Sequence, residues 1–262
     1  MGIFNLLRHS AKRVIRASYN TTDRKKFYRL ITDIERLYSS IWCVYHSISF
    51  DHFASKINRD KWLEAKNFRE LVRAEYKLKV KGLPIYGGIP GSVGGGGVDP
   101  AKIYFLTKLL NPNVVLETGV SSGVSSRSFL QAISENGHGF LYSSDLRVLL
   151  PEGKTGFMVP NELKRSWLLY TEGDDLNIPV ILNQIGKIDI FHYDSVKSYN
   201  KIENVLKILL PYFHSGTMII IDDIDRHFFF KNTDFPDKKK LIFNNVGVYF
   251  PTAKYKTLFN RT

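Results

Sequence analysis

The sequence is poor in cysteine, since Cys43 is the single one among 262 residues. One cysteine can form neither an internal disulfide nor a cysteine-based metal site, and it fits a reducing compartment. Apolar runs are short: none reaches the roughly 18–20 residues that a membrane-spanning helix needs. The start of the chain also lacks the apolar core of a signal peptide. These absences favour a cytoplasmic protein.

A complete dinucleotide fingerprint is missing as well. Residues 114–126 read VVLETGVSSGVSS, a short apolar run, a turn with Gly119 and Gly123, and the beginning of a helical pattern. This strand–turn–helix arrangement is typical of a nucleotide-type site, because the glycines let backbone amides approach a ligand at a helix N-terminus. However, Ser121 and Val124 stand at two of the three glycine positions of G-x-G-x-x-G, which disfavours NAD.

Positive charge is concentrated in the first third of the chain. Residues 1–82 hold 18 Lys and Arg against 8 Asp and Glu, whereas residues 83–262 hold 19 against 17. Residues 1–16 have apolar positions at helical spacing opposite basic ones, which predicts an amphipathic helix. Such a helix can contact an anionic membrane from the cytoplasmic side or pack on the protein itself. A solvated helical surface would produce the same pattern.

The chain divides into two parts on composition. Helical periodicity over residues 23–47 and 61–80 predicts a helical cap, and residues 82–98 form a linker with eight glycines and two prolines. We expect this linker to be a hinge or a loop that closes over a ligand. Residues 1–98 are therefore predicted to be a basic cap plus linker, and residues 99–262 to be the catalytic domain.

From residue 99 the pattern alternates between helix and strand. Asp99 and Pro100 supply an N-cap and a first-turn proline for a helix to about Leu110. Strands are predicted at 114–118, 140–144, 167–171, 188–193 and 217–221, with helices at 125–135, 175–184 and 198–210 between them. Residues 241–250 and 255–259 read as one or two further strands. This order predicts an α/β fold, a Rossmann-like doubly wound, mostly parallel sheet.

Acidic side chains follow the ends of these predicted strands. They are Glu117, Asp145, Asp174, Asp194, Asp222 and Asp223. The carboxyl ends of parallel strands meet at one edge of a sheet, where α/β proteins bind ligands. An unpaired buried carboxylate is costly, so packing alone does not explain such a recurring position.

Five segments in order resemble the class I S-adenosylmethionine-dependent methyltransferases. They are LETGVSSGVSS, NGHGFLYSSDLR, GFMVPNELKRSWLLYTEGD, IDIFHYDSVKSY and LLPYFHSGTMIIIDDI. The resemblance covers about residues 99–223 and is strongest for the small-molecule and sugar O-methyltransferase branch. It implies a Rossmann-like fold and S-adenosylmethionine as the methyl donor. Ser121 departs from a glycine that is common in the family.

The resemblance also implies roles for the residues at the strand ends. Glu117 and the turn formed by Gly119, Ser121, Ser122 and Gly123 would lie beside the methionine part of the cofactor. Asp145 would accept hydrogen bonds from the ribose hydroxyls, because a carboxylate can accept two at once. Asp174 would lie near the adenine amino group, and Asp194 would complete the cofactor site.

The remaining acids suggest a metal ion. Asp194, Asp222 and Asp223 are hard oxygen donors of the kind that Mg²⁺ prefers, and a bound Mg²⁺ would orient the acceptor hydroxyl and lower its pKa. Capping of the next helix by the two later acids is the alternative. A general base is also needed, and His227, His192 and Lys197 are the candidates. The family often has His where this chain has Lys197, which could instead hold an anionic acceptor.

We therefore expect an O-methyltransferase that acts on a hydroxyl of a small molecule or saccharide, with Mg²⁺ as a candidate cofactor. The basic N-terminal part keeps a nucleic-acid methyltransferase as an alternative. Against it, residues 83–262 are nearly neutral, and HYDS stands where amino-methylating enzymes of nucleic acids carry an aromatic and Asn/Pro motif. A degenerate methyltransferase fold that serves as a binding module is the third possibility.

Overall fold

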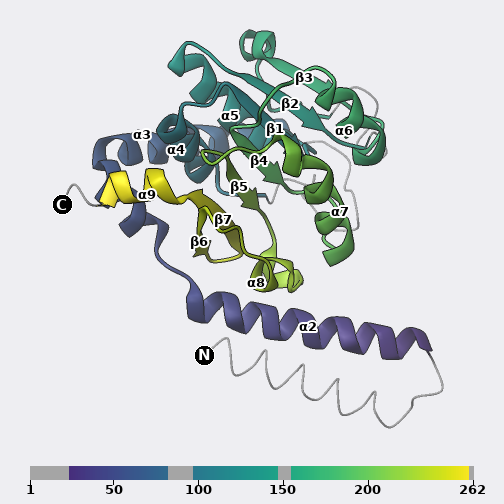
Figure 1. Cartoon of the computed structure of the whole chain (residues 1–262). Coiled ribbons are helices and arrows are strands. Elements are labelled where there is room, and N and C mark those ends of the chain that lie inside the picture. Colours follow the sequence, from purple (N-terminus) through teal and green to yellow (C-terminus); the bar gives the residue numbers. More distant parts are fainter. Residues whose placement is uncertain (1–23, 82–96, 147–154, 260–262) are drawn as a thin grey trace.

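The computed structural model describes residues 24–81, 97–146 and 155–259. Figure 1 shows a twisted central sheet flanked by helices, with α2 (Arg24–His46) set apart from the rest. The amphipathic helix predicted for residues 1–16 lies outside the described residues, as does the glycine-rich loop apart from Gly97 and Val98. Within the described ranges, no helix combines the length and the apolar character needed to cross a membrane.

The sheet has seven strands in the order β3-β2-β1-β4-β5-β7-β6. Strands β1 to β5 run parallel, whereas β7 is antiparallel to both β5 and β6. The strands are β1 (Val114–Thr118), β2 (Phe140–Ser144), β3 (Trp167–Tyr170), β4 (Ile190–Tyr193), β5 (Met218–Ile221), β6 (Lys238–Phe243) and β7 (Val246–Pro251). The order changes direction between β1 and β4, and ligands of doubly wound sheets bind at that point. The predicted mostly parallel, Rossmann-like sheet is confirmed.

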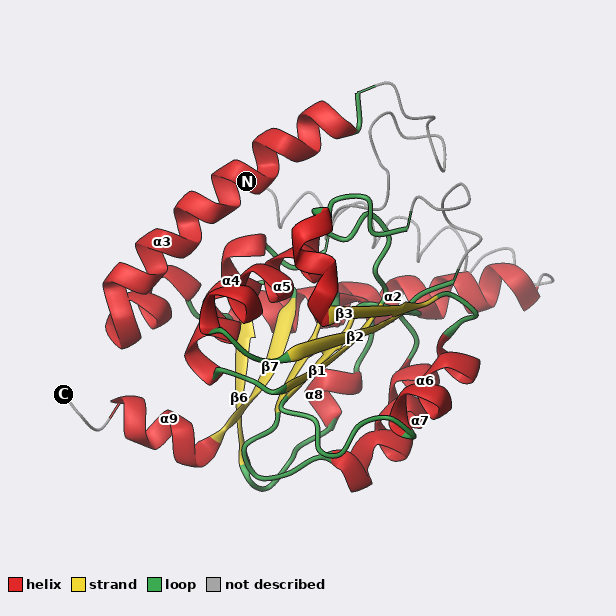
Figure 2. Ribbon diagram, turned by 90° about the horizontal axis from the view of Figure 1, so that it is seen from above, coloured by secondary structure: helices red, strands yellow, loops and turns green. Residues whose placement is uncertain are grey.

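Helices cover both faces of the sheet, as the view from above shows (Figure 2). The α-helices after α2 are α3 (Phe50–Lys79), α4 (Pro100–Leu110), α5 (Val124–Asn136), α6 (Asp174–Leu182), α7 (Tyr199–Leu209), α8 (Phe229–Asn232) and α9 (Thr252–Phe259). Short 3-10 helices are η2 (Asn161–Ser166), η3 (Leu210–Tyr212) and η4 (Ile224–Arg226).

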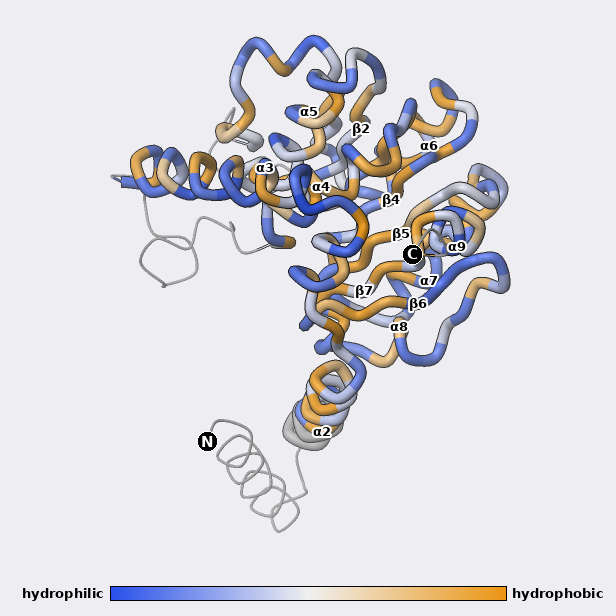
Figure 3. Tube along the Cα trace, turned by 90° about the vertical axis from the view of Figure 1, so that its left-hand side faces the viewer, coloured by the Kyte–Doolittle hydropathy of each residue, from blue (hydrophilic) through white to orange (hydrophobic). Residues whose placement is uncertain are grey.

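Two apolar cores result, one on each face. Val115 and Ile190 pack with α3, α4 and α5, whereas Leu116 and Phe191 pack with α6 and α7. Successive residues of a strand point to opposite faces, so strands buried on both faces read as continuous apolar runs. Figure 3 shows this for β5 and β7, which form a hydrophobic interior.

Local sequence signals explain the boundaries of two helices. The Asp99 side chain accepts a hydrogen bond from the Ala101 amide at 2.9 Å and caps α4, as predicted. Helix α3 begins at Phe50, earlier than predicted, and breaks at Asn58 (φ −161°, ψ 100°). The Asn58 side chain then accepts a hydrogen bond from the Lys61 amide at 2.9 Å, so the predicted start at residue 61 corresponds to the second half of the helix.

The C-terminal tail differs from the prediction. β6 and β7 form a hairpin whose turn includes Asn244 at φ +62°. Residues 255–259, predicted as a strand, belong to helix α9 instead. The rings of Tyr255 and Phe259 stack four residues apart with centroids 4.4 Å from each other, and Phe259 also contacts Phe53 of α3. The apolar positions in this tail therefore follow helical spacing.

The first two helices pack against different parts of the domain. α3 lies along α4 and contributes Phe53 and Trp62 to its core, whereas α2 packs against η4 through the buried Cys43. The part of the predicted cap that the structure describes is thus helical. α3 shares a core with the part of the chain that follows residue 98. The division of the chain into two parts at that residue stays a prediction.

Candidate functional site

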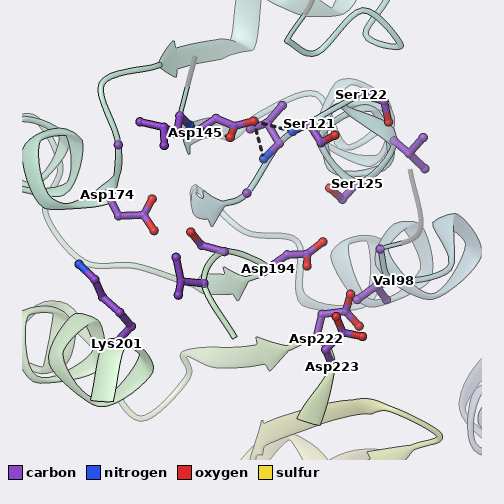
Figure 4. Close-up of a pocket in the computed structure, with 18 of the residues that line it drawn as sticks. Val98, Ser121, Ser122, Ser125, Asp145, Asp174, Asp194, Lys201, Asp222 and Asp223 are labelled. Carbon is purple, nitrogen blue, oxygen red and sulfur yellow. Dashed lines mark hydrogen bonds between the residues drawn. The ribbon is translucent and has the colours of Figure 1, made fainter. Parts of the chain in front are cut away.

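A cavity of about 840 Å³ opens at the carboxyl ends of β1, β2, β4 and β5. Figure 4 shows acidic side chains around it: Asp145 and Asp174 on one side, Asp222 and Asp223 on the other, and Asp194 between them. Among the predicted site residues, these five acids and Gly119, Ser121 and Ser122 line the cavity. The strand-end acids other than Glu117 are therefore brought together.

The turn between β1 and α5 has the open backbone that a close ligand requires. Gly119 and Gly123 have φ values of +82° and +84°, and Ser121 has +47°. A Cβ atom on Gly119 would collide with the carbonyl oxygen of Asp194. The absence of a side chain at Gly119 therefore allows the ends of β1 and β4 to lie close together. The geometry of the turn thus requires glycine at both positions, because glycine adopts a positive φ without steric cost.

Asp145 supports the same turn. Its carboxylate accepts hydrogen bonds from the amides of Val120 and Ser121 at 3.1 and 2.5 Å, and from its neighbour Leu146 at 2.7 Å. Burial raises the pKa of this carboxyl, while the three amides counteract the shift. In this arrangement Asp145 orders the turn. Its predicted contact with the ribose hydroxyls stays a prediction.

Asp174 lies at the start of α6 and accepts a hydrogen bond from the Ser144 hydroxyl at 2.6 Å. The buried Asn177 donates to the Ser144 hydroxyl and to the carbonyls of Asp145 and Tyr170, at 3.0 to 3.2 Å. This amide ties the ends of β2 and β3 to α6. Asn177 was not predicted to be a site residue. Its position three residues after Asp174, within the first turn of α6, was the signal that could have indicated it.

Lys201 of α7 is a second residue that the sequence did not reveal. Its ammonium group contacts both carboxylate oxygens of Asp175, at 2.8 and 2.6 Å, and both residues line the cavity. This ion pair joins α6 to α7 across the mouth of the cavity. Because Asp175 is largely exposed and Lys201 is partly exposed, the ion pair contributes little to folding stability.

Glu117 does not line the cavity but lies beneath it. Its carboxylate is fully buried between β1 and α5, where Ser125, Ser126 and Ser143 donate hydrogen bonds of 2.5, 2.6 and 2.9 Å. The ring of His192, the β4 neighbour of Glu117, lies 3.5 Å away. In this arrangement Glu117 has a structural role between β1 and α5. Its predicted contact with the methionine part of the cofactor stays a prediction.

His192 and His227 are also placed away from the cavity. His192 is fully buried against Phe129, and neither of its ring nitrogens has a hydrogen bond within the described part of the chain. His227 is 4% exposed, and burial and the nearby Lys197 lower its pKa to about 4. Neither histidine lines the cavity, which makes both poor candidates for the general base.

Lys197 lies among the acids. Its ammonium group contacts the Asp194 carboxylate and is 3.9 Å from Oδ2 of Asp223. Asp223, at φ +53°, is also held by Arg226 at 3.3 Å and by the Asn245 amide at 3.2 Å. These contacts balance the charges of Asp194 and Asp223.

Asp222 has the weakest compensation. It is 2% exposed, and among the described residues its carboxylate accepts one hydrogen bond, of 3.5 Å, from the Asn245 side-chain amide. Burial and the neighbouring Asp194 raise the pKa of this carboxyl to about 7. A buried carboxyl that titrates near neutral pH and lines a cavity is characteristic of functional sites.

The predicted magnesium site was compared with this geometry. Among the described residues, no group of three or more Asp, Glu, His or Cys side chains lies close enough to hold a metal ion. The Lys197 ammonium group takes the place of a cation between Asp194 and Asp223. The donors as arranged do not fit Mg²⁺, so we derive no step through a metal, and its role stays a prediction.

Comparison with known families finds a match to one family model. Residues 116–224 match the family model described as a methyltransferase domain. The match begins in β1 and ends in η4, so it contains every acid that lines the cavity. No curated protein sequence matches the chain.

Several solved structures resemble the chain. They include a methyltransferase from Geobacter sulfurreducens (19% identity, 58% of this chain and 78% of that chain, TM-score 0.45). The O-methyltransferase TomG from Streptomyces achromogenes, solved with SAM, has 14% identity over 72% and 90% of the two chains, with a TM-score of 0.46. The methyltransferase PaMTH1 from Podospora anserina, solved with SAH, has 13% identity over 81% and 93%, with a TM-score of 0.45.

Proposed function

We propose that the chain is a class I, S-adenosylmethionine-dependent methyltransferase that methylates a hydroxyl oxygen of a small molecule or saccharide. The match of residues 116–224 to a methyltransferase domain and the doubly wound sheet support this. One observation carries the choice of a hydroxyl: a buried, weakly paired carboxyl, Asp222, lines the cavity beside Asp194, whose carboxylate contacts the ammonium group of Lys197. A hydroxyl, unlike a thiolate or an amine, needs a base to take its proton during transfer.

In this proposal the cofactor lies along the turn between β1 and α5. Asp145 holds the amides of that turn, and Asp174 lies on the same side of the cavity, across from Asp222 and Asp223, where it is available to the adenine amino group. The methyl group would then be directed towards Asp194 and Asp222. Bound S-adenosylmethionine would supply an electrophilic methyl group for an in-line displacement, in which the bond from carbon to the acceptor oxygen forms as the bond from carbon to sulfur breaks and S-adenosylhomocysteine leaves.

Asp222 accepts the hydroxyl proton, and Lys197 provides positive charge near the developing anion. Asp222 suits this role better than either histidine, because it lines the cavity and its pKa of about 7 lies near the working pH. Only the ionised carboxylate accepts a proton, so kcat/KM should rise as the pH increases through about 7. A profile without an inflection in that range would contradict this assignment.

A transfer assay with labelled S-adenosylmethionine tests the proposal. The panel contains monosaccharides, sugar nucleotides and phenols, together with RNA and DNA. We expect label in an alkali-stable methyl ether of a hydroxyl compound. Label confined to RNA or DNA would favour the nucleic-acid alternative, and cofactor binding without transfer to any acceptor would favour a binding module.

Two variants connect the assay to the site. Asp222→Asn should lower kcat at least about 100-fold, the usual contribution of a general base, while cofactor affinity changes little. The exposed Asp234, which pairs with Lys240 at 3.0 Å, provides the matched control, Asp234→Asn. Equal activity of the two variants would remove Asp222 from the reaction.

We also propose that the protein works in the cytoplasm, in peripheral contact with the inner face of a membrane through residues 1–16. The basic and apolar pattern of that segment supports this. Full-length protein should sediment with vesicles containing anionic lipid, and a chain without residues 1–16 should not. Equal sedimentation of both would contradict the proposal.

A further inference from the structure

A second cavity, of about 510 Å³, adjoins the first. The two share the lining residues Gly97, Val98, Val124 and Asp222. In Figure 4, Val98 lies beside Asp222, across the site from Asp174. The second cavity therefore opens on the proposed base from the side opposite the expected adenine end, which is where an acceptor would enter.

Three structural elements that meet at this point form the walls of the second cavity. The C-terminal part of α3 contributes Arg73 and Lys77, the start of α4 contributes Lys102, and the turn between β6 and β7 contributes Asn244 and Asn245. The cavity thus combines three cations with amide groups that can donate hydrogen bonds. Such a set is suited to an anion rather than to a neutral ligand.

The acids of the second cavity leave two of these three cations without an ion pair among the described residues. Asp99 is already shared by Arg69 at 3.5 Å and Arg73 at 3.4 Å. Asp222 is the other acid in the lining. Within the described residues, neither Lys77 nor Lys102 has an ion pair or a hydrogen bond to a side chain or carbonyl.

Lys102 is the more informative of the two lysines because it is partly buried. Its ammonium group lies 5.7 Å from the centre of the Phe50 ring. Burial lowers its pKa, and the more distant carboxylates of Asp99, Asp222 and Asp51 counteract only part of this shift. Removing a cation from water without a carboxylate partner is unfavourable, and a bound anion would offset that cost. Lys77 is exposed at the rim, where it can meet the same anion.

We propose that the acceptor is a hydroxyl compound that carries an anionic group, a phosphate or a carboxylate, which Lys77 and Lys102 bind in the second cavity. The inference rests on the proposed O-methyl transfer and adds the class of acceptor. Anion binding at this site would leave the hydroxyl on the Asp222 side, next to the methyl donor. Lys77 and Lys102 determine specificity and take no part in the proton transfer.

Ligand-observed NMR on the full-length chain tests anion binding. The probes are phenyl phosphate, benzoate and benzyl alcohol, which share one ring and differ in charge. We expect saturation transfer to an anionic probe and a dissociation constant for benzyl alcohol at least about tenfold higher, because hydrogen bonds to charged groups are the stronger ones. The tighter of the two anions identifies the group. Equal binding of benzyl alcohol would overturn the proposal.

Variants place the binding in the cavity. Lys77→Gln and Lys102→Gln should each weaken anion binding at least about tenfold. Lys56→Gln removes an exposed positive charge from α3 away from the cavity and should leave binding unchanged. Lys77 is exposed, so its variant keeps the test valid even if Lys102→Gln fails to fold. Equal weakening by Lys56→Gln would show that the anion responds only to net charge, which contradicts the proposal.

Methyl transfer separates this inference from the proposed function. Charged and neutral acceptors with the same hydroxyl are compared in the presence of saturating S-adenosylmethionine. Lys77→Gln should raise KM for the charged acceptor while kcat and cofactor affinity stay close to wild type. Equal KM values for charged and neutral acceptors would refute the inference alone, whereas anion binding without transfer to any hydroxyl would refute the proposed function alone.

Discussion

Glu117 provides a strong test of the structural reasoning, because sequence resemblance and tertiary structure give it different roles. The resemblance implies a contact with the cofactor, whereas the structure buries the carboxylate among Ser125, Ser126 and Ser143. Glu117→Gln keeps the size of the side chain and removes its charge. The variant therefore affects either cofactor affinity or folding stability, depending on which role is right.

The expected loss of stability follows from these three hydrogen bonds. A bond to a charged acceptor contributes about 1.5–3 kcal/mol and a neutral one about 0.5–1.5 kcal/mol, so three bonds lose on the order of 3 kcal/mol in total. The new amide also turns an NH₂ donor towards hydroxyl groups that donate to the carboxylate in the wild type. A loss of this size is a large part of the stability of an ordinary domain.

Chemical denaturation gives the free energy of unfolding, and calorimetry of the folded variant gives its affinity for S-adenosylmethionine. We expect Glu117→Gln to be less stable by about 3 kcal/mol while its cofactor affinity stays within about threefold of wild type, which is less than 1 kcal/mol. Glu162→Gln, at an exposed position of η2, is the control and should change neither quantity. Wild-type stability together with a cofactor affinity reduced more than about tenfold would refute the structural role.

Three further predictions concern the strand ends. Gly119→Ala should prevent folding or cofactor binding, because φ is +82° and the new Cβ collides with the Asp194 carbonyl; normal thermal unfolding and calorimetry would contradict this. Burial raises the pKa of Asp222 to about 7, so its ionisation opposes folding above that pH and the cost fades as the pH falls towards about 4. Asp222→Asn should therefore raise the Tm at pH 8 more than at pH 5. Asp223→Asn removes a charge that is already paired and should not raise the Tm. Equal Tm shifts for Asp222→Asn at both pH values would contradict a destabilising charge on buried Asp222. Chelation should leave methyl transfer unchanged, since Lys197 lies between the acids; activity lost with chelator and restored by Mg²⁺ would instead support the predicted metal site.

Local patterns in the sequence are sufficient to predict much of the fold. β1 and β2 have the predicted bounds, because each is a short apolar run that ends at a turn or an acid. The cap of α4 by Asp99 is likewise a property of adjacent residues. The recurrence of acids after the strands predicted one ligand-binding edge, and the parallel sheet brings five of these acids into one cavity.

The direction in which each side chain points was decided by the tertiary structure. Glu117 lies under α5, and His192 and His227 are buried away from the cavity, because packing of helices on the sheet determines which face is closed. The last apolar residues form α9 rather than a strand, since their rings pack against α3.

The sequence by itself determined the fold class and the edge of the sheet at which the acids gather, because strand periodicity and turn chemistry are local. Only the tertiary structure brought Arg73 and Lys77 of α3 beside Lys102 of α4 and the Asp222 carboxyl of β5's end. Those residues are up to about 150 positions apart in the chain, and long-range packing alone makes them neighbours. Short local segments therefore predict the residues of the first cavity. The second cavity, proposed for the acceptor, depends on how helices distant in the sequence pack against the sheet.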